Sequence, residues 1–146
     1  KWYAEQGRLG LQDEPLFPGM FKLINDLKFN KKFHIGVATN KSRIALNNGL
    51  KKHNLINIFD ITLTMDEAKA KPDPDMAIQA MSKLNIEKKS TIIVGDTIND
   101  IGLGVNAGIN SIGVAWGYNS IEMLRNEGAD FIIKDSEELF DTIINL

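Results

Sequence analysis

From Pro18 onward, short apolar runs that suit strands alternate with longer amphipathic segments that suit helices. The expected strands cover residues 33–38, 60–65, 91–94, 111–115 and 130–133. Short, mostly apolar runs are typical of parallel strands that are buried on both faces. Strands that alternate with helices in steps of roughly 25 residues predict βαβ units. We therefore expect an α/β fold: a Rossmann-like open parallel sheet with helices on both faces.

Helical spacing of apolar residues predicts which face of each intervening helix is buried. Helices are expected after Pro18, over about 41–52, around 77–84, over about 99–107 and 120–126, and after an N-cap at Asp135-Ser136. The buried faces are expected to hold Phe21, Leu23, Ile24 and Leu27 in the first helix, Ala77, Ala80, Met81 and Leu84 in the third, and Leu139, Phe140, Ile143 and Ile144 in the last.

Composition and charge narrow the class of partner. The 146 residues, 43% of them hydrophobic, are enough for one domain with a core. The formal net charge of −2 gives no global field toward nucleic acid or anionic lipid. No apolar run approaches the roughly 20 residues of a membrane span. The chain has no cysteine, which excludes disulfides and is compatible with a reducing cytoplasm, so we expect a cytoplasmic protein.

Two carboxylates follow the apolar run at 91–94. Gly95 allows the backbone to turn sharply, and Asp96 is thereby placed at the end of a predicted strand. Ligands of open parallel sheets bind outside the carboxyl ends of the strands. Asp100 lies one helical turn further on and can face the same way. Hard oxygen ligands at such a place suit Mg²⁺, but Asp96 or Thr97 as a simple helix N-cap is equally compatible with the sequence.

Thr39 and Lys71 follow two other predicted strands. The Thr39 hydroxyl and the adjacent backbone N–H groups suit an oxyanion, although a helix cap is the alternative. Lys71 precedes Pro72, which disfavours a helical backbone at the lysine and holds it in a defined position. Such a lysine can place a point charge on a phosphate, whereas an exposed loop lysine is the alternative. Lys69, which has no following proline, is expected in solvent.

Together, a hydroxyl, a cation and a carboxylate after successive strands of one sheet indicate phosphate handling with Mg²⁺. The aromatic stretch 116–118, Trp-Gly-Tyr, also follows a predicted strand. It can line the entrance for a substrate or pack beneath a loop.

Three motifs resemble, in order and spacing, the second, third and fourth motifs of the haloacid dehalogenase-like hydrolases, and they are closest to the phosphoglycolate-phosphatase-like branch. They are GVATNK at 36–41, KPDP at 71–74 and VGDTINDI at 94–101. The flanking stretches LFPGM, NAGINSIGVAWGY and GADFIIKDSEEL are similar to that branch as well, so the resemblance covers nearly the whole chain.

The resemblance implies a Mg²⁺-dependent phosphomonoester hydrolase that acts on a small phosphorylated metabolite through an aspartyl-phosphate. Thr39 would bind the phosphoryl oxygens with Asn40 beside it. Lys71 would neutralise the phosphate and orient the nucleophile. Asp96 would ligate Mg²⁺. Asp100 would either ligate the ion as well or support its site without contacting it.

The first motif of that family, Asp-x-Asp-Gly-Thr, does not occur in this sequence. It carries the nucleophile at the end of a central strand, which would lie between the strands that end at Ala38 and Val94. We therefore expect residues 1–16 to be the tail of a cap domain and a linker, and residues 17–146 to be a partial hydrolase core. About 80 further residues are expected upstream, by comparison with usual domain sizes.

Other functions remain open at this point. A catalytically incomplete fragment that binds phosphate or a partner is one alternative. Within the enzymes, β-phosphoglucomutase-like or pyrophosphatase-like activity is the near alternative, and the oligomeric state is unknown. A signalling receiver domain also uses Asp, Thr and Lys at strand ends, but the order Thr39, Lys71, Asp96 opposes it.

Overall fold

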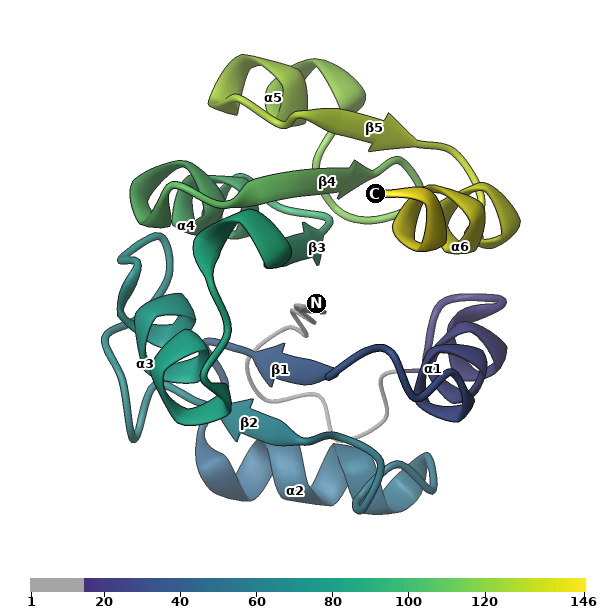
Figure 1. Ribbon diagram of the computed structural model, residues 1–146, viewed down its shortest axis with the longest axis vertical. Helices are drawn as coiled ribbons and strands as arrows, with labels where there is room; N and C mark the ends of the chain where they lie inside the picture. The colour runs from purple at the N-terminus through teal and green to yellow at the C-terminus, as the bar shows by residue number, and fades with distance from the viewer. Residues whose placement is uncertain (1–14) are drawn as a thin grey trace.

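The computed structural model describes residues 15–146, in which helices and parallel strands alternate (Figure 1). The helices are α1 (Met20–Phe29), α2 (Arg43–Lys52), α3 (Asp75–Leu84), α4 (Ile98–Ala107), α5 (Ile121–Glu127) and α6 (Ser136–Asn145), with a 3₁₀ turn, η1 (Lys88–Ser90). The strands are β1 (Gly36–Ala38), β2 (Ile61–Leu63), β3 (Ile92–Gly95), β4 (Asn110–Val114) and β5 (Phe131–Ile133). The predicted α/β class is confirmed.

Side-chain caps fix where four of these helices begin. A capping oxygen accepts a backbone N–H that has no partner within the helix. Ser42 accepts from Ala45, Ser120 from Met123 and Asp135 from Glu138. Thr97 and Asp100 form a reciprocal capping box at the start of α4. These caps place α2, α4 and α5 immediately after the loops that follow β1, β3 and β4.

The strands form two parallel sheets, and no hydrogen-bonded ladder joins β1 to β3. In one sheet β1 pairs with β2, with Val37 opposite Thr62. In the other, β4 lies between β3 and β5, with Val94 opposite Ile112 and Val114 opposite Ile133. The break between the sheets coincides with the position at which the family resemblance places an absent strand.

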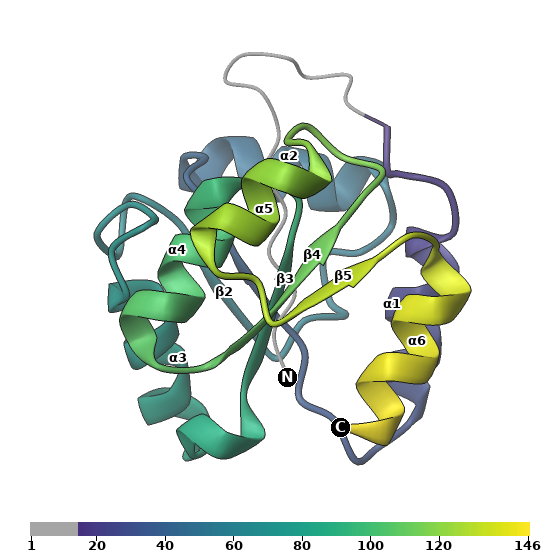
Figure 2. The same cartoon turned by 90° about the horizontal axis from the view of Figure 1, so that it is seen from above.

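Both sheets are buried on their two faces, as the short apolar runs predict. Figures 1 and 2 show α1 and α6 on one side of the strands and α3 and α4 on the other. On the first side Val37, Ile92 and Val94 belong to a cluster that includes α1 and α6. On the second side, Ala38, which follows Val37, and Ile93, which lies between Ile92 and Val94, pack with α3 and α4. Neighbouring strand residues thus point to opposite faces.

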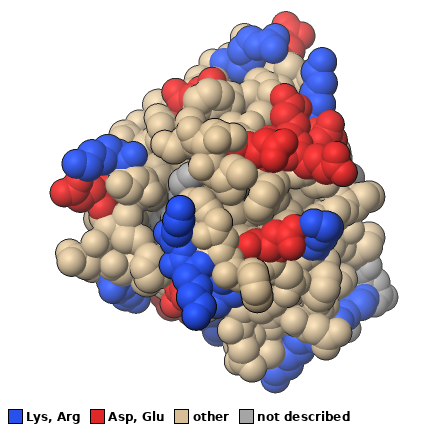
Figure 3. Space-filling view, turned by 45° about the vertical axis from the view of Figure 1, so that its right-hand side comes forward, with Lys and Arg blue, Asp and Glu red and all other residues tan. Residues whose placement is uncertain are grey.

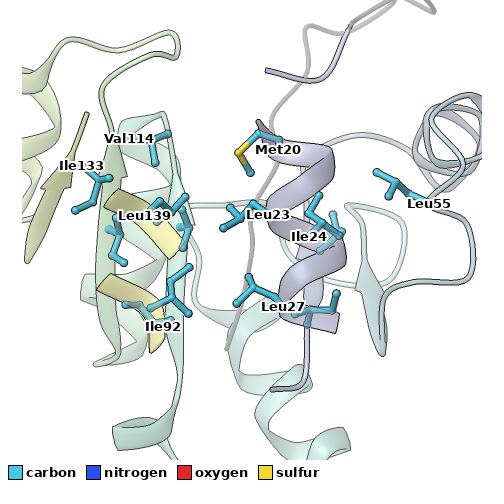
Figure 4. Packing of buried hydrophobic residues seen from close by; sticks show 14 of the residues in the cluster. Met20, Leu23, Ile24, Leu27, Leu55, Ile92, Val114, Ile133 and Leu139 are labelled. Carbon is cyan, nitrogen blue, oxygen red and sulfur yellow. The ribbon is translucent and has the colours of Figure 1, made fainter. Parts of the chain in front are cut away.

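The larger cluster extends across the break between the sheets. It includes Ile35 and Val37 from the region of β1, and Ile92 and Ile112 from the second sheet. Figure 4 shows Leu23 and Leu27 of α1 directed toward the part of this core that holds Leu139 and Ile92. The two sheets are therefore held together by apolar packing rather than by backbone hydrogen bonds.

The surface carries charges of both signs. Figure 3 shows basic and acidic side chains on one face, some of them side by side, with much uncharged surface between these groups, and neither sign covers that face. This mixture fits the small net charge of −2 and gives no extended basic surface there for nucleic acid. In the described part of the chain, no helix has both the length and the apolar character that crossing a membrane requires.

Two buried faces differ from the prediction. Phe21 is 49% exposed, because the buried stripe of α1 begins one residue earlier and consists of Met20, Leu23, Ile24 and Leu27. Ile144 is 41% exposed, because α6 turns Leu139 and Ile143 inward and Ile144 lies further around the helix. The expected cap tail and linker, 1–16, fall almost entirely outside the described residues.

Candidate active site

Lys71 and Asp100 form a buried ion pair at the carboxyl ends of the strands. The Lys71 ammonium donates to Oδ1 of Asp100, and both side chains have 0% exposure. Oδ2 of Asp100 accepts from the Thr97 amide at 3.1 Å and from its hydroxyl at 2.9 Å. A lysine is almost never fully buried unless it is paired. The alternative of an exposed loop lysine is therefore wrong for Lys71, whereas Lys69 is exposed as predicted.

Asn40 holds the backbone of Lys71 in place. Its side-chain oxygen accepts from the Lys71 amide at 2.8 Å, and its side-chain nitrogen donates to the Lys71 carbonyl at 3.1 Å. This pair of bonds joins the loop after β1 to the loop before α3. The Lys71–Pro72 peptide bond is cis. Sequence reasoning did not foresee this use of Asn40, since the bond spans 31 residues.

Asp96 is a buried carboxylate that directly follows β3. Only 3% of its surface is exposed, and Oδ2 accepts from the Tyr118 amide at 2.8 Å. Burial raises the pKa of Asp96 above its ordinary value, and the nearby Asp100 carboxylate acts in the same direction. The Tyr118 amide and the Lys71 ammonium oppose that rise in pKa. Asp96, Asp100 and Lys71 are therefore close enough to act on one another electrostatically.

Helix capping does not explain Asp96. Thr97 is the N-cap of α4, and Asp100 completes the box. A Cβ added at Gly95 would lie 2.2 Å from the Cβ of Asp100, so the Asp100 side chain occupies space that only a glycine leaves open. The turn 95–100 thus places the Asp100 carboxylate against Lys71, with Asp96 beside that pair.

Thr39 is a buried hydroxyl at the end of β1. Its exposure is 1%, and its Oγ1 accepts from the Lys41 amide at 3.2 Å. The N-cap of α2 is Ser42, so helix capping does not explain Thr39 either. Its neighbour Asn40 ties it to the Lys71 loop. The structure thus gathers Asn40, Lys71, Asp96 and Asp100 at the strand ends, with Thr39 adjacent along the chain.

Residues 116–118 contribute both to the core and to the candidate site. The indole ring of Trp116 packs against the larger core cluster, and its Nε1 is buried without a hydrogen-bond partner among the described residues. Tyr118 is 48% exposed and makes an edge contact with Phe17, with ring centroids 6.4 Å apart. Its backbone amide contacts the site through Asp96. No side-chain pattern could predict a contact that the main chain makes.

The described residues offer few carboxylate ligands for Mg²⁺. Residues 15–146 contain no cluster of three or more His, Asp or Glu side chains that could enclose a metal ion. Mg²⁺, however, usually takes only one or two protein carboxylates and completes its octahedron with water and substrate phosphate. Asp96 suits that role, because it is buried at a strand end, whereas both oxygens of Asp100 are engaged by Lys71 and Thr97.

Sequence comparison decides the family. The family model for haloacid dehalogenase-like hydrolases matches residues 3–114, which is most of the chain. The chain belongs to this family. The match includes Thr39, Asn40, Lys71, Asp96 and Asp100.

Two individual relatives support this family assignment. The pyrophosphatase PpaX of Bacillus velezensis is 31% identical over 121 residues, which cover 82% of this chain and 56% of the relative. PpaX of Anoxybacillus flavithermus is 33% identical over 114 residues, which cover 77% and 53%. The chain thus spans little more than half the length of these curated relatives.

Solved structures share the fold. A predicted phosphatase from Clostridium acetobutylicum superposes with a TM-score of 0.78 at 33% identity, over 89% of this chain and 60% of its own. A predicted phosphoglycolate phosphatase from Haemophilus somnus gives a TM-score of 0.80 at 24% identity, over 88% and 57%. At 24% identity, the second superposition supports a shared fold and nothing further.

Proposed function

We propose that these residues form most of the core of a Mg²⁺-dependent phosphatase. Asp96 ligates the metal ion, and Asp100 supports the site by holding Lys71. Lys71 and the Thr39 hydroxyl bind the phosphoryl oxygens, with the backbone of Asn40 beside them. Mg²⁺, when bound, neutralises charge on the transferring phosphoryl group. We place the protein in the cytoplasm, in keeping with a chain that has no cysteine.

The buried Lys71–Asp100 pair carries this proposal. Burying two opposite charges is unfavourable unless the geometry and the further hydrogen bonds are good. Here Asn40 fixes the lysine backbone and Thr97 satisfies the remaining carboxylate oxygen. A well-packed apolar pair would stabilise the loop as well or better. The presence of a buried cation beside Asp96 therefore favours a functional role for Lys71. Fixed cations stabilise the charge of a phosphoryl transition state.

We further propose that the nucleophile, an aspartate, comes from outside these residues. The Asp-x-Asp-Gly-Thr motif does not occur in the sequence, and no ladder joins β1 to β3, which is compatible with one more parallel strand between them. A carboxylate at the end of such a strand would reach the edge at which Thr39 and Asp96 lie. It would attack phosphorus as the ester P–O bond breaks and the alcohol leaves, which gives an aspartyl-phosphate. Water would then displace the aspartate from phosphorus and release inorganic phosphate.

The substrate class is a small phosphorylated metabolite, with phosphomonoesters such as phosphoglycolate as the first choice. Pyrophosphate is the second candidate, because the PpaX relatives are named as pyrophosphatases and are 31% and 33% identical. The test is a panel of phosphomonoesters and pyrophosphate with the N-terminally extended protein and Mg²⁺. Release of phosphate from one class above all others identifies the substrate, and no release from any would contradict the proposal.

A further inference from the structure

The loop between β4 and α5 lies directly against Asp96, although it is 20 residues further along the chain. The Tyr118 amide donates to Oδ2 of Asp96 at 2.8 Å. The approach is close: a Cβ added at Gly117 would lie 2.1 Å from the Cβ of Asp96 and 2.3 Å from its Oδ2. The Asp96 side chain is thus enclosed by backbone, which limits the rotamers that it can adopt.

Asn119 attaches this loop to the turn that carries Asp96, and it does so twice. Its backbone amide donates to the Asp96 carbonyl at 3.0 Å. Its side-chain oxygen accepts from the Ile98 amide at 2.8 Å. Ile98 is the first residue of α4, and an amide in the first turn has no partner within its own helix. One residue thereby bonds the chain on both sides of Thr97.

The side-chain bond is specific to asparagine or aspartate at this place. The Ile98 amide needs an acceptor within reach of a short side chain, and alanine would offer none. Loss of that acceptor would leave Asn119 attached to the Asp96 turn through its backbone amide alone, while Trp116 and the Tyr118 ring attach the loop elsewhere. Residues 117–118 would then be held less closely against Asp96, and the Tyr118 amide less closely to its Oδ2.

We infer that Asn119 is a positioning residue for the metal ligand. It holds residues 117–118 against Asp96, and they in turn fix the carboxylate in the orientation that binds Mg²⁺. Groups behind a metal ligand commonly change metal affinity about 10- to 100-fold when they are removed. The inference rests on the proposed function, because it requires Asp96 to be a ligand.

The test is the dissociation constant for Mg²⁺, measured by calorimetry on the N-terminally extended protein, with the melting temperature measured in parallel. We expect Asn119→Ala to weaken binding about tenfold. Asn119→Asp, which keeps an acceptor for Ile98, should bind at least as tightly as the wild type. Asn119→Gln moves the amide by one methylene and should weaken binding as alanine does, which keeps the test available if the alanine variant does not fold.

Ser120→Ala is the matched control, because it removes a cap from the same loop without touching Asp96 or Ile98. It should lower the melting temperature and leave the Mg²⁺ constant unchanged. Unchanged affinity in both Asn119→Ala and Asn119→Gln, or an equal loss in Ser120→Ala, would overturn the inference. A wild type that does not bind Mg²⁺, or an Asp96→Asn variant that binds it equally well, would instead overturn the metal assignment itself.

Discussion

Lys71 lies in an environment that is unusual for a lysine. Its side chain is fully buried with Asp100, while Lys69, two residues away, is exposed. The proline that follows Lys71 pointed to a fixed backbone, but only the structure shows that Asn40 and Asp100 complete the restraint. Lys71 could thus be named as a candidate from sequence, whereas its bonds to Asn40 and Asp100, 31 and 29 residues away, could not be foreseen.

Replacement of Lys71 by alanine in the N-terminally extended protein should lower the turnover rate by orders of magnitude. The substitution removes the charge that compensates the phosphoryl group in the transition state. Steady-state phosphate release at saturating Mg²⁺ measures the effect. Lys69→Ala is the control and should change the rate little. Equal losses in the two variants would contradict the role of Lys71.

Two glycines allow a matched test of the packing around Asp96. Gly117→Ala should lower the free energy of unfolding by about 1–3 kcal/mol, because the new methyl group would overlap the Asp96 side chain. Gly49→Ala, inside α2 with nothing within 4 Å of the added Cβ, should raise that free energy by about 0.5–1 kcal/mol. Urea unfolding measures both. A gain in stability for Gly117→Ala would show that the loop does not approach Asp96 this closely.

The elements themselves were largely predictable, because strands and helices follow from local apolar spacing. The five expected strands all occur, and Asp135 caps α6 as expected. Of the candidate site, the sequence predicted which polar residues lie at the strand ends: Thr39, Lys71, Asp96 and Asp100. Their role as a site stays a prediction. The role of the loop 115–119 could not be predicted. Its contact with Asp96 is made by a backbone amide and a glycine, which side-chain patterns do not reveal.

The start of α2 is tied to the loop after β2 by an ion pair with a measurable pH dependence. The Arg43 guanidinium donates to Glu67 at 2.7 Å and, with the hydroxyl and amide of Thr64, lowers the pKa of Glu67 from 4.5 to about 2. A carboxyl whose pKa is lowered by folding stabilises the fold above pH 4.5. That stabilisation is lost as the pH falls from 4.5 toward about 2.

Arg43→Met should therefore reduce the loss of stability over this acid range, since the pKa of Glu67 would return toward 4.5. Urea unfolding at a series of pH values from 2 to 6 measures it. Lys89→Met is the control, because Lys89 and Glu87 are 80% and 71% exposed and their pair is screened by solvent. If Arg43→Met and the wild type lose stability in parallel, the ion pair does not set this pH dependence.

Across the whole molecule, the most consequential feature is the division of the strands into two sheets that pack into the same two apolar clusters. An unprotected strand edge can pair with other strands, so proteins usually pair, cover or otherwise protect such edges. If a further strand fills the break, amides of β1 and β3 should exchange with deuterium more slowly in the N-terminally extended protein than in this chain. Amides of β5, at the far edge of its sheet, should exchange equally in both. Equal exchange in β1 and β3 would contradict the proposed strand.

The central claim is that Asp96 and Lys71 belong to a Mg²⁺-dependent phosphatase whose nucleophile lies outside these residues. Phosphate release with Mg²⁺, measured side by side on this chain, the N-terminally extended protein and its Asp96→Asn variant, tests it most directly. We predict activity in the extended protein alone, with Asp96→Asn folded, inactive and no longer responsive to Mg²⁺. Activity in this chain by itself, or full turnover in Asp96→Asn, would contradict the account.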